Sequence, residues 1–186
     1  KLPTLKTILA SKLFNDATSQ NKKDKMTISF QKIVLEMSLF LCPNMDISKY
    51  SLAAIYSLEG TNQISLKKLE SISEKSFLSL ASNLKKMSII KDFKNTNHYK
   101  KLLFKNFQKW PENKFILYRL ANHYKSEKKY YKALKIYKRI IKNYGESTRL
   151  LFLYATCLDK VGQWNKAKSL LLDLLEKDAN DTYTLN

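Results

Sequence analysis

The sequence predicts an all-α fold, a right-handed superhelical solenoid of about five antiparallel helix pairs, in a single helical-repeat domain of residues 1–186. The main observation is an internal repeat, because the segment that begins at Leu117 recurs from Leu151 with an offset of 34 residues. The aligned pairs are Ala121 with Ala155, Tyr130 with Trp164, Ala133 with Ala167 and Ile140 with Leu174. A fixed period of this length is typical of stacked helix pairs, in which each repeat contacts only its neighbours.

Composition and hydrophobic spacing support the same fold. The chain has only three glycines and three prolines, whereas an all-β protein with many turns usually needs more of both. Apolar residues make up 44% of the chain and recur at three- and four-residue spacing, as they do on the buried stripe of a helix. Small residues such as Ala121, Ala133, Ala155 and Ala167 are expected where two helix backbones approach closely.

The first pair is predicted from helical patterns over residues 5–14 and 28–41. The polar segment between them, residues 15–27, is expected to be a mobile loop. Pro43 ends the second helix, because proline cannot continue a helix and disfavours helical geometry at the residue before it.

The next two pairs follow the same template less regularly. In the second pair Leu52, Ala53 and Tyr56 take the large, small and aromatic places of a first helix, which Gly60 closes. In the third pair these places are assigned to Leu80, Ala81 and Leu84, and a second helix is expected from His98 to Trp110, before Pro111. The segment between these two helices, residues 88–97, is longer than the template allows.

The last two pairs are those of the 34-residue repeat. The expected repeats therefore span residues 3–45, 46–73, 74–113, 114–147 and 148–181, and residues 182–186 are expected to begin a further repeat.

The two most regular repeats resemble the tetratricopeptide repeat. The matching residues are Leu158, Gly162, Trp164 and Ala167 in one, and Leu120, Ala121, Tyr124, Tyr130 and Ala133 in the other. The proline usual near the end of a repeat is Gly145 in one and Ala179 in the next, which softens the turns. The resemblance implies a scaffold or adaptor that binds a protein or peptide. It also suggests a bacterial protein of the cell envelope or periplasm, with the cytoplasm as the alternative.

The charge leaves a second function open. The formal net charge is +18, and lysines supply all but three of the 34 basic residues. AT-rich codons give such a lysine-rich composition, whereas nucleic-acid binders often use arginine for bidentate contacts. Lysine suffices for non-specific phosphate binding, so the alternative function is a basic helical-repeat protein that binds nucleic acid. We otherwise expect only weak, non-specific attraction of polyanions.

Lysines alternate with aromatic residues in several stretches, which is also a pattern of single-strand binding grooves. The repeat template instead assigns Tyr124, Tyr130 and Tyr137 to packing, and we favour that interpretation.

The sequence predicts neither catalysis nor a bound metal or cofactor. His98 and His123 have no partners at the spacing of a metal site, and the sequence contains no glycine-rich phosphate loop or nucleophile motif. Cys42 and Cys157 lie in different repeats, so each is expected to pack as a small apolar side chain. No apolar run approaches the roughly 18 residues of a transmembrane helix.

By the family resemblance, the first helix of each pair lines a concave groove through its second, fifth, ninth and twelfth positions. The groove residues expected on this basis are Tyr50, Ser57, Lys75, Ser82, Lys85, Phe115, Tyr118, Asn122, Lys125, Arg149, Phe152, Thr156 and Asp159. Phe115, Tyr118 and Phe152 are the candidate anchors, because the packing template gives them no role; the alternative is that they rest against a neighbouring repeat. Asn122 and Arg149 match the family's carboxylate clamp only in part, so capture of a peptide C-terminus is not predicted.

Overall fold

The computed structural model describes residues 4–19, 25–92 and 96–183. These residues contain ten α-helices and no strand, so the predicted all-α helical-repeat fold is confirmed. The helices are α1 (Leu5–Ser19), α2 (Lys25–Leu41), α3 (Asp46–Leu58), α4 (Asn62–Glu70), α5 (Ser79–Asp92), α6 (Thr96–Lys109), α7 (Lys114–Ser126), α8 (Tyr130–Tyr144), α9 (Thr148–Lys160) and α10 (Trp164–Tyr183).

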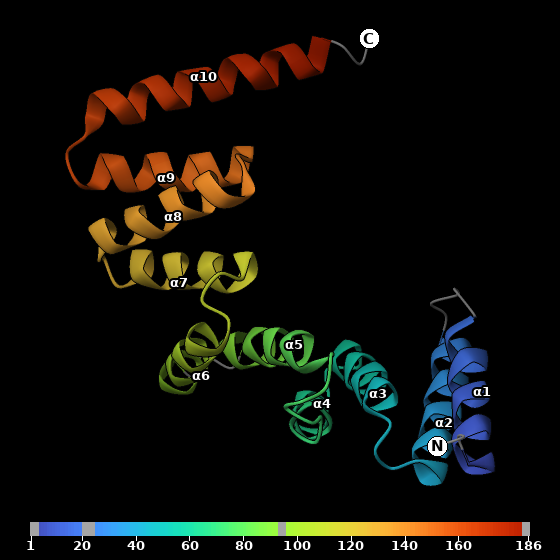
Figure 1. Ribbon diagram of the computed structural model, residues 1–186. Helices are drawn as coiled ribbons and strands as arrows, with labels where there is room; N and C mark the ends of the chain where they lie inside the picture. The colour runs from blue at the N-terminus through green and yellow to red at the C-terminus, as the bar shows by residue number, and fades with distance from the viewer. Residues whose placement is uncertain (1–3, 20–24, 93–95, 184–186) are drawn as a thin grey trace. The chain divides into compact units, whose positions relative to one another are not determined.

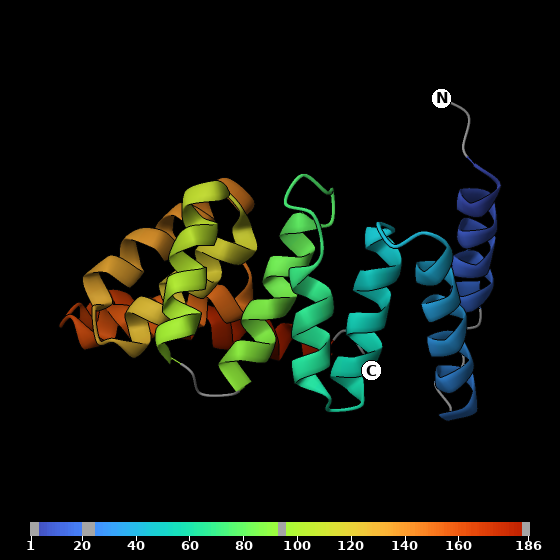
Figure 2. The same cartoon turned by 90° about the horizontal axis from the view of Figure 1, so that it is seen from below.

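The chain divides into two compact units, residues 1–99 and residues 100–186, whereas the sequence analysis expected one domain. In the first unit each helix from α1 to α5 packs on the next, and α1 and α2 form a hairpin (Figure 2). In the second unit α7, α8, α9 and α10 stack one after another (Figure 1). The C-terminal unit has one continuous core, formed by residues from α7, α8, α9 and α10.

The 34-residue period extends further upstream than the sequence analysis recognised. The second helices of four successive pairs begin at Asn62, Thr96, Tyr130 and Trp164, each 34 residues after the one before. Burial repeats at the same interval, since Ala53, Met87, Ala121 and Ala155 are all completely buried. The expected burial of Ala133 and Ala167 is also confirmed.

The predicted register of the third pair is therefore wrong. Met87 takes the place that was assigned to Ala81, and Ala81 is only partly buried. Methionine is unbranched and fills irregular gaps in a core, so this repeat lacks the small residue that marks the others. The helix α5 also continues through residues 88–92, which were expected to lie between helices.

Two other segments differ from expectation. Residues 15–19 of the predicted loop belong to α1, because its helical hydrogen bonding continues to Ser19; residues 20–24 lie outside the described part of the chain. Residues 182 and 183, where a further repeat was expected to begin, continue α10, and residues 184–186 of that expected repeat lie outside the described part of the chain. Pro43 does follow the end of α2, as predicted.

Three described turns between paired helices, those after α3, α7 and α9, share one geometry. Gly60 and Gly162 have φ of 77° and 80°, and the N–H of the next residue donates to the carbonyl oxygen of Tyr56 or Leu158. Lys128 holds the equivalent place after α7, with φ of 58°, and Lys129 N–H donates to Tyr124 C=O over 2.8 Å. Left-handed geometry costs a residue with a Cβ free energy that glycine avoids, so Lys128 is a strained version of the same turn.

Candidate functional site

On α7, two of the expected groove residues are accessible and two are tied into the fold. Phe115 is 64% exposed, and Lys125 is partly exposed. Tyr118 packs against the core of the C-terminal unit. Asn122 donates from its side-chain amide to the carbonyl oxygen of Tyr118 over 3.0 Å and accepts from the Tyr137 hydroxyl over 2.9 Å. Asn122 therefore orients α8 on α7, which is a role in the fold.

On α9, the expected groove residues lie together on one face. Phe152 is 55% exposed, and its carbonyl oxygen accepts from the Thr156 hydroxyl over 2.8 Å. Asp159, one turn further on, pairs with Lys160 at 3.2 Å. Arg149 is exposed one turn before Phe152.

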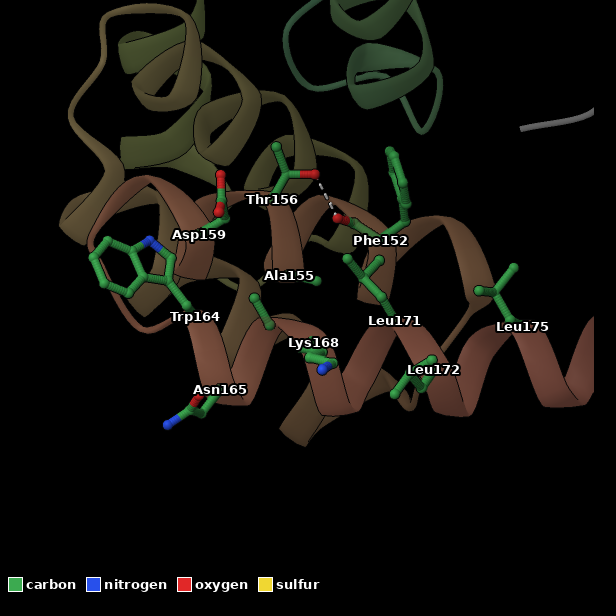
Figure 3. A pocket seen from close by; sticks show the side chains of 11 residues that line it. Phe152, Ala155, Thr156, Asp159, Trp164, Asn165, Lys168, Leu171, Leu172 and Leu175 are labelled. Atoms are coloured by element: carbon green, nitrogen blue, oxygen red, sulfur yellow. Dashed lines mark hydrogen bonds between the residues drawn. The ribbon is translucent and has the colours of Figure 1, made fainter.

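These α9 residues line two adjoining pockets together with side chains of α10. The first pocket has a volume of about 570 Å³ and is lined by Phe152, Thr156 and Asp159, with Trp164, Lys168, Leu171, Leu172 and Leu175 from α10 (Figure 3). The second has a volume of about 580 Å³ and contains Arg149, Phe152, Leu171 and Leu175. The α9–α10 face is defined here as the eight residues named for the first pocket.

The α10 half of this face is the part that sequence reasoning missed. The expected groove residues all came from first helices, and Trp164 was identified only as a match to the repeat template. The counterparts of Leu171 at 34-residue intervals, Leu69, Leu103 and Tyr137, are all completely buried, but Leu171 is partly exposed. In the part of the chain that the structure describes, no first helix follows α10.

The groove residues expected in the N-terminal unit differ in their exposure and in the elements that carry them. Tyr50 and Ser57 lie on α3 and are partly exposed. Lys75 lies in a turn before α5, and Lys85 lies on α5, partly exposed. Ser82 is 2% exposed and donates a hydrogen bond of 3.0 Å to the carbonyl oxygen of Leu69. Its expected place in a groove is wrong because the register of the third pair is shifted by six residues.

A charged cluster lies near the start of the C-terminal unit. Glu127 accepts from Lys129 and Lys100, and these two bonds lower its pKa to about 2. His123 lies one helical turn before Glu127, and 3.2 Å separate its Nε2 from a carboxylate oxygen of Glu127. The partly buried ring packs edge-on against Phe104, and burial lowers the pKa of His123.

The cluster does not make a metal site, and no group of three or more His, Cys, Asp or Glu residues among the described residues could hold a metal ion. Cys157 is buried, which raises the pKa of its thiol. None of the described helices is long and apolar enough to cross a membrane.

The lysine-rich aromatic stretches also have a clear arrangement. Tyr137 is fully buried, and Tyr124 and Tyr130 pack against the same core, as the repeat template predicted. Lys132 lies over the ring of Tyr124, 5.7 Å from its centroid. These three rings contribute to packing, and Tyr130 also lines an open pocket with Tyr131 and Lys129.

Comparisons with known proteins place this geometry in context. Residues 124–184 match the family described as tetratricopeptide repeat, and no curated protein matches the chain. The fold is similar to a MamA from Desulfovibrio magneticus RS-1, with a TM-score of 0.72 and 10% identity over 95% of this chain and 97% of that one. A second MamA structure has a TM-score of 0.70 and 15% identity, over 96% of this chain and 94% of that one.

A further solved structure, described as YrrB, a tetratricopeptide-repeat protein with an unusual peptide-binding site, has a TM-score of 0.60 and 11% identity. That match covers 88% of this chain and 91% of YrrB. At these identities the likeness concerns the fold alone.

Proposed function

We propose that this chain, in which residues 124–184 match the tetratricopeptide-repeat family, is a scaffold that holds an amphipathic helix of a partner protein on the α9–α10 face. Proteins of this family are in general non-catalytic interaction modules. The proposal concerns the surface that is used and the kind of partner that fits it.

The observation that carries the proposal is the exposure of Leu171 at a repeat position that is otherwise buried. One repeat earlier, the equivalent residue Tyr137 lies in the core beneath α9, together with Leu150 and Cys157. The chain thus contains an example of how such a face is covered, namely by a helix with a stripe of apolar side chains. A partner helix with apolar residues at three- and four-residue spacing would cover the α9–α10 face in the same way.

The accessible side chains supply the anchors that such a contact needs. Trp164 is 68% exposed and Leu175 is 65% exposed, on either side of the partly exposed Leu171. Tryptophan is enriched among the few residues that dominate the binding energy of interfaces. Burial of apolar surface contributes about 25 cal/mol for each Å² removed from water, so each of these side chains that a partner covers favours the complex.

The charges around the face favour a partner with acidic residues at the edge of its apolar stripe. Arg149 and Lys168 line the two pockets, and the chain as a whole carries a net charge of +18. Complementary charges at the rim of an interface mainly raise the association rate and select the partner.

The proposal is tested by affinity capture with the full chain from an extract of the cells that produce it, followed by mass spectrometry. Phe152→Ala and Leu175→Ala should each reduce recovery of the main partner, because both remove an exposed apolar side chain of the face. Tyr131→Ala is the matched control, since Tyr131 is 67% exposed on α8 but lies outside the face.

Equal recovery by all three variants and the unchanged chain would contradict the use of this face. Recovery that disappears after nuclease treatment would instead support the nucleic-acid function.

A further inference from the structure

The helix α2 carries an apolar stripe that the fold leaves uncovered. It consists of Met26, Phe30, Ile33, Met37 and Phe40, all of which are exposed; Met26 and Phe40 are 85% and 87% exposed. The opposite face of α2 packs in the core of the N-terminal unit through Val34 and Leu35. One side of α2 is therefore buried in the core, whereas the stripe on its other side is left exposed by the described residues.

The spacing of the stripe is that of a coiled-coil seam. Its residues follow one another at intervals of four, three, four and three, which places them at successive d and a positions of a heptad. A stripe confined to these two positions is narrower than the apolar face of a helix in a globular core, and it suits contact with one other helix.

Two charged side chains of α2, Lys32 and Glu36, are already engaged within the unit. The Lys32 ammonium pairs with Glu59 at 2.9 Å and lies over the ring of Tyr56. The carboxylate of Glu36 accepts from the Tyr56 hydroxyl at 3.0 Å and from Lys68 at 3.4 Å.

The stripe itself contains no charged residue, although the chain is strongly basic. Two copies can therefore bring their stripes together without placing like charges opposite each other. An anionic partner or lipid headgroup would find no cation within the stripe to bind.

We propose that the α2 stripe is the seam of a homodimer, in which α2 of one copy packs against α2 of a second copy. The available area fits this occupant. Side chains of this size expose roughly 200 Å² each when free, so the five together offer on the order of 650 Å². That is close to the about 800 Å² per partner of a standard stable interface, and the flanks of α2 can supply the difference.

The test is sedimentation velocity of the full chain at loading concentrations from about 1 to about 200 µM, a range that brackets micromolar dissociation constants. The unchanged chain should shift from monomer to dimer across this range. Ile33→Lys and Phe40→Lys should each stay monomeric at concentrations at least tenfold above the midpoint of the unchanged chain, because each places a cation within the seam. Both positions are exposed, so far-ultraviolet circular dichroism should show unchanged helix content.

Phe77→Lys is the matched control, because Phe77 is 82% exposed in the turn before α5 and lies outside the stripe. It should dimerise like the unchanged chain. A chain that remains monomeric at the highest concentration would overturn the proposal, and so would dimers that persist in both stripe variants. A monomer that sediments with phosphatidylserine vesicles, and loses this binding in Ile33→Lys, would replace the second copy with a lipid surface.

Discussion

The hydroxyl of Tyr137 on α8 donates a hydrogen bond of 2.9 Å to the side-chain oxygen of Asn122 on α7. Asn122 in turn donates to the carbonyl oxygen of Tyr118, one turn earlier on α7. Because the ring of Tyr137 is fully buried, this bond fixes how the second helix of the pair rotates on the first.

Tyr137→Phe should reduce the free energy of unfolding by about 1 kcal/mol, since it removes this hydrogen bond and keeps the ring. Urea denaturation of the full chain measures the change. In combination with Asn122→Ala, the two effects should not add, because each single substitution already removes the shared bond. Strictly additive effects would show that the bond does not contribute to stability.

Lys128→Gly should stabilise the chain by about 0.5–1 kcal/mol, because glycine relieves the left-handed geometry of this turn. Gly162→Ala makes the opposite change at the equivalent turn and should destabilise by about 1 kcal/mol. A Cβ at Gly162 would meet no atom within 4 Å, so the effect isolates backbone strain from packing. Thermal unfolding of both variants checks the prediction, and a destabilised Lys128→Gly would contradict it.

The corrected register of the third pair predicts different responses at adjacent residues. Ser82→Leu should destabilise by about 1–3 kcal/mol, because the larger side chain must enter a packed site and the hydrogen bond to the Leu69 carbonyl oxygen is lost. Ala81→Leu should change stability by less than about 1 kcal/mol, because Ala81 is partly exposed. The reverse order in urea denaturation would support the register expected from the sequence.

Stability should decrease as the pH falls from about 7 to about 5, in part through His123. Burial lowers its pKa in the folded chain, whereas the unfolded chain binds a proton near the ordinary value of about 6.5. Protons therefore favour the unfolded state below that pH. Glu127 remains ionised throughout this window, because Lys129 and Lys100 hold its pKa near 2.

The measurement is the free energy of unfolding at both pH values for the unchanged chain and for His123→Gln. The variant should lose less stability between pH 7 and pH 5 than the unchanged chain. An identical loss in both would show that His123 does not titrate differently on folding.

The sequence predicted the helices better than the surface. Alanines and leucines that recur at the same repeat positions are packing residues, so an alignment of two segments was enough to predict the pairs in residues 114–181. Met87 concealed the register of the third pair, because a flexible side chain can fill the place that alanine takes in the other repeats. The role of Asn122 could not be read from spacing, since its hydrogen bond to Tyr137 depends on the rotation of one helix on another. The exposure of Leu171 depends on whether a further helix covers α10, and its own sequence pattern matches that of buried residues.

The most direct test of the proposed scaffold is a titration of the captured partner protein against the full chain at about 50 and about 200 mM salt. The account predicts that affinity changes by less than about tenfold between these salt concentrations, because burial of apolar surface is not screened, and that Phe152→Ala weakens binding by about 1–3 kcal/mol at both. A fluorescently labelled single-stranded oligonucleotide should bind only weakly, and should be released at the higher concentration. The contradictory result is an oligonucleotide that binds more tightly than the protein partner. Its affinity would then fall steeply as the salt concentration rises, because binding releases counterions from the phosphates, and it would not change in Phe152→Ala.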